Sequence, residues 1–134
     1  MDESKQPLVT VIAISYNHAT FIKEALASVF NQTYKNIELI VVDDASTDNS
    51  VAVINSCIDG KDILFLKNET NNGNCASFNQ AYKKSLGKYI IDFALDDIMY
   101  PDRIAKQVAL FKSATDKTGV VFCNVDVIDT AGVK

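Results

Sequence analysis

The chain lacks any cysteine pattern that would indicate a disulfide framework or a zinc site. Its three cysteines, Cys57, Cys75 and Cys123, are odd in number and widely spaced. Disulfide-stapled folds need paired cysteines, and zinc sites need closely spaced ones. We therefore expect buried, reduced thiols in a cytoplasmic protein.

Long hydrophobic runs are also missing. One of the longest hydrophobic runs covers residues 37–42, and Glu38 interrupts it. A run of this length is too short to cross a bilayer. Residues 1–7 have no apolar core of a signal peptide. The sequence predicts a soluble chain with no membrane segment.

Basic residues are too few to balance the acidic ones. There are 13 Lys and Arg against 17 Asp and Glu, which gives a net charge of −4. Such a chain repels nucleic acid and anionic lipid at long range, so we expect neither as a partner. A small anionic ligand remains compatible, because a bound metal ion can invert the local charge.

Glycine-rich phosphate loops are absent as well. The sequence has no GxxxxGK[ST], and no GxGxxG follows the first expected strand. A nicotinamide dinucleotide-binding domain is therefore disfavoured. A phosphate bound by this chain would depend more on a metal ion than on a nest of glycines.

What the chain does contain is an alternation of apolar patterns along a single domain of residues 1–134. Its 48% hydrophobic and 22% charged residues are ordinary for a globular protein. Strands are predicted over residues 8–14, 37–42, 63–66, 89–95 and 120–125. Four helices are predicted between them. The resulting fold class is α/β, a mostly parallel sheet with helices on both faces.

Local signals place these helices more closely. Thr20 is expected to cap the first helix, and Gly87 to end the third. Pro101 fits the first turn of the fourth. Apolar residues at helical spacing are expected to face the core, and in the third helix these are Cys75, Phe78, Tyr82 and Leu86.

Polar side chains gather where the predicted strands end. Ligands of open parallel sheets bind beyond the carboxyl ends of the strands. Asp43 and Asp44 follow the second strand, and Asp96 and Asp97 follow the fourth. Carboxylates collected at one edge repel one another unless a cation joins them, and hard oxygen ligands favour Mg²⁺ or Mn²⁺. Asp is equally typical of turns and helix caps, which is the interpretation for Asp48.

Four segments together resemble a known family. They are VTVIAISYN (9–17), NQTYKNIELIVVDDASTD (31–48), NNGNCASFNQAYKKSLGKYI (71–90) and FALDDIMYPDRI (93–104). In this order they resemble family 2 glycosyltransferases of the GT-A fold, whose donor-binding half is Rossmann-like. The resemblance implies transfer of a sugar from a nucleoside diphosphate sugar, with UDP as the expected nucleotide, to an acceptor with inversion. The acceptor, a saccharide or a lipid-linked molecule, is not identified.

The resemblance also implies roles for individual residues. Asp44 would hold the nucleobase, and the DXD-type element would hold ribose and a Mn²⁺ or Mg²⁺ ion through Asp96 and Asp97. The implied nucleotide-binding residues are Ile14, Ser15, Tyr16, Asp43, Asp44, Asn72, Gly73 and Asp96.

Two residues that are common in the family are missing from this chain. The family's catalytic base is expected in another part of the protein. Ala94 stands where many members have a further Asp, and Phe78 stands where an Arg is common. No catalytic residue is assigned, because the family's base is expected beyond Lys134, in the acceptor-binding part. Asp126 and Asp129 are interpreted as strand and turn acids.

One alternative function remains, a non-catalytic signalling domain like a phosphoacceptor receiver. The acidic run over residues 40–44 has the character of a receiver's Mg²⁺-binding cluster. A receiver, however, carries its acid pair after the first strand and a lone Asp after the third, where this chain has Lys67, Asn68 and Glu69.

Overall fold

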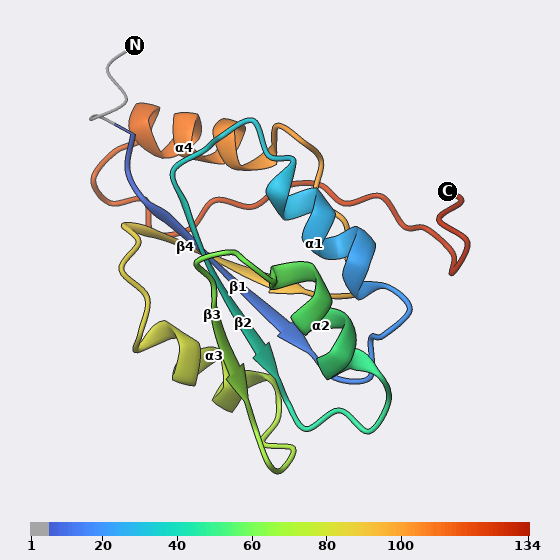
Figure 1. Cartoon of the computed structure of the whole chain (residues 1–134). Coiled ribbons are helices and arrows are strands. Elements are labelled where there is room, and N and C mark those ends of the chain that lie inside the picture. Colours follow the sequence, from blue (N-terminus) through green and yellow to red (C-terminus); the bar gives the residue numbers. More distant parts are fainter. Residues whose placement is uncertain (1–5) are drawn as a thin grey trace.

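The computed structural model describes residues 6–134, which form one parallel sheet with helices on both faces. The strands are β1 (Val9–Ser15), β2 (Ile37–Asp43), β3 (Leu64–Lys67) and β4 (Tyr89–Ala94). Their order across the sheet is β3-β2-β1-β4, and every neighbouring pair is parallel (Figure 1). The predicted α/β class is confirmed.

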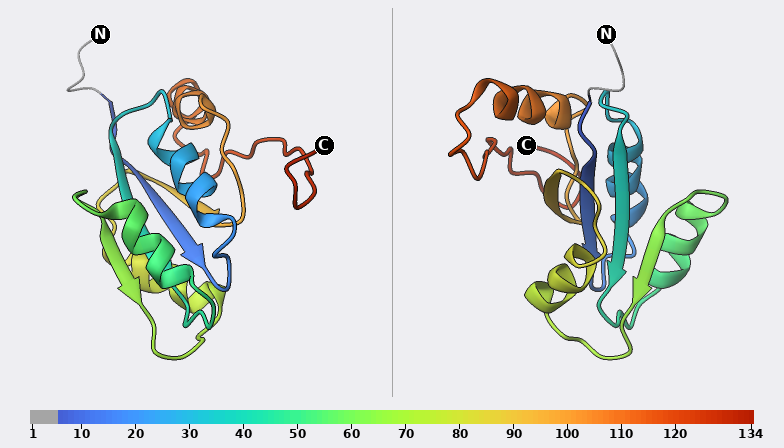
Figure 2. Two further views of the ribbon diagram at one scale, coloured as in Figure 1. Left: turned by 45° about the vertical axis from the view of Figure 1, so that its right-hand side comes forward. Right: turned by 90° about the vertical axis from the view of Figure 1, so that its left-hand side faces the viewer.

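The core lies on both sides of β1, whose residues are all buried. On one face Val11 and Ala13 pack with α1 (Ile22–Phe30), α2 (Ser50–Ile58) and α4 (Arg103–Ser113). On the other face Ile12 and Ile14 pack with α3 (Asn74–Tyr82). Successive strand residues point to opposite faces, so an uninterrupted apolar strand such as β1 needs helices on both sides. Figure 2 shows this division of the helices.

The fifth predicted strand is wrong. Residues 114–129 have no strand pairing, and the side chains of Phe122 and Val125 are 86% and 81% exposed. A β-branched run fits a pleated surface, but its backbone becomes a strand only when another strand pairs with it. The segment is held instead by side-chain contacts, including one from Gln107 Nε2 to the Val121 carbonyl at 3.3 Å.

The helix starts also differ from the sequence prediction. Thr20 does not cap α1, since Phe21 occupies the N-cap position without a side-chain cap bond. The carbonyl of His18 instead accepts from the N–H groups of Phe21 and Ile22. Helix α4 begins at Arg103, two residues after Pro101.

The predicted inner face of the third helix is correct only at Phe78, which packs against the core. Helix α3 buries its small residues Ser77 and Ala81, while Tyr82 is 54% exposed. Small side chains let this helix approach β1 and β2 closely. Two of the thiols expected to be buried, Cys75 and Cys123, are exposed, and Cys57 is half-buried.

No helix within residues 6–134 is long and apolar enough to span a membrane.

Gly87 does not end α3, which stops at Tyr82. It lies against β1 instead. A Cβ atom at position 87 would be 2.5 Å from both the backbone N and the Oγ1 of Thr10, and 2.8 Å from the Tyr89 carbonyl oxygen. The Gly87 N–H donates to Thr10 Oγ1 at 2.9 Å, and that hydroxyl contacts Glu38. The absence of a side chain therefore permits the close approach.

We predict that Gly87→Ala destabilises the fold by about 1–3 kcal/mol, the usual cost of forcing an extra carbon into a packed site. Urea unfolding followed by circular dichroism measures it. Gly119→Ala is the matched control, because a Cβ there meets no atom within 4 Å. Equal stability of the two variants would contradict the assigned role of Gly87.

Candidate functional site

A cleft of about 270 Å³ lies at the carboxyl edge of the sheet. It is bounded by the ends of β1, β2 and β4 and by the loop that leads into α3. The residues that line it are Ile14, Tyr16, His18, Asp44, Asn71, Gly73, Asn74 and Ala94. The edge predicted from strand order thus carries a real concavity, and Ile14, Tyr16, Asp44 and Gly73 are sequence-predicted residues within its lining.

The carboxylate of Asp44 organises this cleft. It is 3% exposed and accepts three hydrogen bonds: from Asn68 Nδ2 at 2.8 Å, from the Asn72 N–H at 2.9 Å and from the Gly73 N–H at 2.8 Å. Burial alone would raise the pKa of Asp44. The three hydrogen bonds from Asn72, Asn68 and Gly73, together with the nearby Ser77 hydroxyl, outweigh it and hold this pKa below its ordinary value.

Gly73 gives the loop its shape. Its φ of 85° and ψ of 160° belong to a region that only glycine adopts readily. This conformation turns the Asn72 and Gly73 N–H groups toward Asp44 and places Asn71 and Asn74 on the cleft. The predicted residue Asn72 is therefore part of the wall through its backbone, although it is not among the lining residues.

Two other predicted residues, Asp43 and Ser15, are buried and do not line the cleft. Asp43 is fully buried, and its carboxylate accepts from the N–H of Ser46 at 2.9 Å and from its hydroxyl at 2.6 Å. The hydroxyl of Ser15 is buried with no hydrogen-bond partner. Asn17, at a φ of 56°, joins the loops after β1 and β2 by accepting the Thr47 N–H at 2.8 Å. These contacts fix the loops that follow β1 and β2.

Asp48 has the local role that its sequence position indicates. It accepts from the Ser50 N–H at 2.9 Å at the start of α2 and from the Ala19 N–H at 3.1 Å. The hydrogen bond from the Ser50 hydroxyl is the main cause that lowers the pKa of Asp48. Asp48 thereby ties the loop after β1 to α2.

Asp96 and Asp97 follow β4 beside the cleft. The Asp96 carboxylate lies 3.5 Å from Nε2 of His18, which is itself a lining residue. Desolvation and then repulsion by Asp96 raise the pKa of Asp97, while Arg103 and His18 act in the opposite direction. A cation placed here would relieve the repulsion between the two carboxylates.

The donor set fits a divalent cation only in part. Within residues 6–134 no group of three or more His, Cys, Asp and Glu side chains could hold a metal ion. Two adjacent carboxylates supply a minority of the oxygen ligands that Mg²⁺ or Mn²⁺ takes. The chemistry therefore suits a cation that shares its remaining positions between water and ligand phosphates.

The acids further along the chain have local partners. Asp129 accepts from the N–H groups of Ala131 and Val133, both at 2.9 Å, as expected of a turn acid. Asp126 contacts the Tyr100 hydroxyl and lies 2.7 Å from Lys134 Nζ. These contacts account for both carboxylates without a ligand.

Sequence reasoning gave no ligand role to four of the residues that line the cleft, which are His18, Asn71, Asn74 and Ala94. It named Ala94 only as the position of a missing Asp and did not propose His18, Asn71 or Asn74 as site residues. The sequence did contain a partial indication for Asn71 and Asn74, because these two asparagines flank the predicted pair Asn72 and Gly73. What was missing is the loop geometry that brings them onto the cleft.

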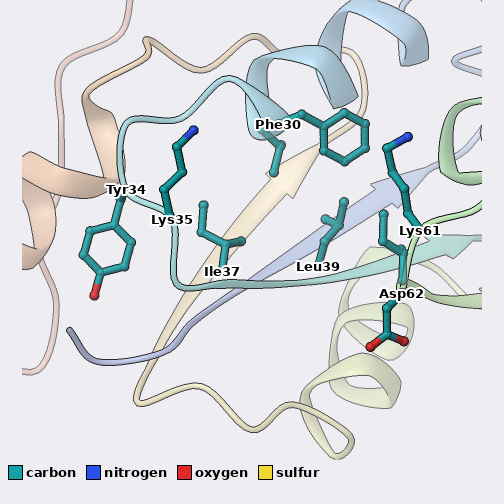
Figure 3. Close-up of a pocket in the computed structure, with 9 residues that line it drawn as sticks. Phe30, Tyr34, Lys35, Ile37, Leu39, Lys61 and Asp62 are labelled. Carbon is teal, nitrogen blue, oxygen red and sulfur yellow. The ribbon is translucent and has the colours of Figure 1, made fainter. Parts of the chain in front are cut away.

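A second hollow of about 240 Å³ lies at the opposite, amino-terminal end of β2. Figure 3 shows Phe30 between Lys35 and Lys61, above Ile37 and Leu39. The Lys61 ammonium lies 5.3 Å from the centre of the Phe30 ring. None of the sequence-predicted site residues lines this hollow.

The parallel sheet and its carboxyl-edge cleft define a Rossmann-like α/β domain. The chain belongs to glycosyl transferase family 2, whose family model matches residues 10–133. An uncharacterized glycosyltransferase of Rickettsia prowazekii is 39% identical over 92% of this chain and 38% of its own length. One of Methanocaldococcus jannaschii is 36% identical over 97% of this chain and 46% of its own length. The chain thus spans less than half of either relative.

Solved structures agree on the fold. A mannosyltransferase from Pyrobaculum calidifontis, in complex with GDP-Man and Mn²⁺, has a TM-score of 0.73 and 26% identity over 80% of this chain and 33% of its own. TarS of S. aureus has a TM-score of 0.71 and 26% identity over 79% of this chain and 20% of its own. These are GT-A enzymes, as the sequence resemblance implied.

The receiver-like alternative loses its support, because the position after β3 holds Asn68, an amide that donates to Asp44.

The pKa of Asp44 leads to a prediction about acid stability. Its value in the folded chain lies below the value of about 3.9 expected when unfolded. The contribution of Asp44 to stability is therefore fully present above about pH 4 and is lost as the pH falls through the folded-state pKa. Asp44→Asn should be less stable at pH 7 by about 1–3 kcal/mol, since buried donors lose a charged acceptor.

The same variant should lose less stability than the unaltered chain between pH 7 and pH 3. Asp48 has a lowered pKa as well, so part of the acid sensitivity should remain. Urea unfolding at a series of pH values measures both effects, with Asp116→Asn at an exposed position as the control. An unchanged pH profile in Asp44→Asn would rule out this role.

Proposed function

We propose that this chain is the donor-binding part of a glycosyltransferase and holds a nucleoside diphosphate sugar at the carboxyl edge of its sheet. The observation that carries the proposal is the cleft itself, which has Asp44 in its lining and His18, in contact with Asp96, at its side. The nucleobase would lie against Ile14, Tyr16 and Asp44. The similar mannosyltransferase, which is in complex with GDP-Man and Mn²⁺, supports a ligand of this class.

The diphosphate would extend from this cleft toward Asp96 and Asp97. Asp96 would hold the ribose, and both carboxylates would bind Mn²⁺ or Mg²⁺ as a DXD-type element. When bound, the cation stabilises the negative charge that grows on the leaving diphosphate. Ala94, which lines the cleft where a further Asp is common in the family, supplies no oxygen ligand. The ligand's own phosphate oxygens are needed for that reason.

Recognition of the base would depend on Asp44 as an acceptor. An ionised carboxylate donates no hydrogen bond. Uracil, thymine and guanine each offer a ring N–H beside a carbonyl, whereas adenine and cytosine offer no such ring N–H. Oδ1 of Asp44 already accepts two bonds and Oδ2 accepts one, so Oδ2 retains capacity for the ring N–H.

The transfer step is proposed for the whole protein. Two Rickettsia relatives are matched over only 38% of their length. We place the binding of a saccharide or lipid-linked acceptor, and the carboxylate base for inverting attack, in the part of such proteins that has no counterpart in this chain. A positioned base contributes about 10²- to 10⁴-fold to such a step.

We predict that Mn²⁺ or Mg²⁺ binds this chain weakly alone and much more tightly with UDP, because two carboxylates leave most of the coordination shell to phosphate and water. Titration calorimetry with and without UDP measures it. Asp97→Ala should abolish the gain, whereas Asp102→Ala should keep it, since Asp102 pairs with Lys106 instead. Tight metal binding without nucleotide, unchanged in Asp97→Ala, would refute the assignment.

We also predict that UDP binds more tightly than GDP or dTDP, and that all three bind more tightly than ADP and CDP. Asp44→Ala should cost about 1.5–3 kcal/mol of UDP affinity, the range for a hydrogen bond to a charged group. Asn68→Ala is the matched control, because it removes one contact of Asp44 but leaves its carboxylate. Equal affinity for ADP and UDP, or full affinity in Asp44→Ala, would leave Asp44 with only its structural role.

A further inference from the structure

One backbone N–H joins two side chains on the wall of the cleft. The Gly73 N–H donates to Asp44 Oδ2 at 2.8 Å and to Asn71 Oδ1 at 3.1 Å. Both Asp44 and Asn71 are lining residues. A shared donor of this kind holds the carboxylate and the amide side by side.

The shared N–H also orients the Asn71 amide. Because an N–H group can only donate, the atom of Asn71 that faces Gly73 must be the carbonyl oxygen. The amino group Nδ2 is then the free end of the side chain, and within the described residues it has no hydrogen-bond partner. Asn71 is exposed, so this amino group is accessible to a ligand.

The wall therefore carries a hydrogen-bond acceptor, Asp44 Oδ2, and a donor, Asn71 Nδ2, on two side chains that share the Gly73 N–H. A ring N–H beside a carbonyl is the complementary pair. We infer that Asn71 is a specificity-determining residue, which donates to the base carbonyl next to the ring N–H that Asp44 accepts. This inference rests on the proposed function, since it concerns the nucleobase in the same cleft.

A carboxylate at position 71 would change the pattern in a defined way. It still accepts the Gly73 N–H, so the loop contact survives, but its free oxygen is now a second acceptor beside Asp44. Uracil has only one ring N–H between two carbonyls, so it loses a hydrogen bond and meets a repulsive oxygen. Guanine has an amino group beside its ring N–H, and it fits two neighbouring acceptors.

The experiment is titration calorimetry of UDP and GDP, each with Mn²⁺, against the unaltered chain and Asn71→Asp. We expect the ratio of the GDP Kd to the UDP Kd to fall by about tenfold in the variant, since one hydrogen bond is lost with uracil and one is gained with guanine. The readout is a ratio, so a general loss of affinity from the added negative charge cancels. Asn79→Asp, the same change on an exposed residue of α3, is the matched control and should leave the ratio unchanged.

A ratio that stays within about twofold in Asn71→Asp, with UDP bound normally by the unaltered chain, would overturn this inference and leave the proposed function intact. An equal shift in Asn79→Asp would also overturn it, because charge alone would then explain the change. Failure of the unaltered chain to bind either nucleotide would reject the proposed function, and this inference with it.

Discussion

The cleft depends on the buried carboxylate of Asp44 and the donors that surround it. A buried charge is costly unless hydrogen bonds replace its water. Here Asn68 supplies a side-chain donor, and Asn72 and Gly73 supply backbone donors. The need to satisfy one charge therefore brings together the end of β2, the residue after β3 and the loop before α3. That charge and the apolar packing of α3 together hold the Asn71 to Asn74 wall against the sheet.

The two ends of the sheet are built on different principles. At the amino end the backbone of Gly87 lies against Thr10, whose hydroxyl connects it to Glu38, and close packing leaves no room for a side chain. At the carboxyl end the loops stand apart and are joined by polar side chains such as Asn17 and Asp48. The loops at the carboxyl end enclose the cleft of about 270 Å³, and this is the edge at which ligands of open parallel sheets bind.

The match to glycosyl transferase family 2 includes all the residues that line the cleft. The family match identifies the class of enzyme. The geometry indicates how roles are divided: Asp44 shapes the wall and retains one acceptor position, while Asp96 and Asp97 form an electrostatically strained pair at the side. Burial first and repulsion by Asp96 second raise the pKa of Asp97, and a nearby cation would offset the repulsion.

The sequence by itself determined the fold class, the four strands of the sheet and the edge that carries the cleft. These follow from local patterns, because buried parallel strands read as apolar runs and their polar ends mark the carboxyl edge. The family could also be identified from the sequence, because four short segments resemble its motifs in the same order.

Only the tertiary structure decided which of these residues reach the cleft. Residues 120–125 have the composition of a strand but no partner for their backbone, and pairing is a non-local property. Helix α3 turned its small residues inward, because the distance to the sheet selects the packed face. Asn71 lines the cleft beside Gly73, whose N–H donates to Asp44, a residue 29 positions away in the sequence. Such a contact depends on three segments meeting in space, and no local pattern in the sequence encodes that meeting.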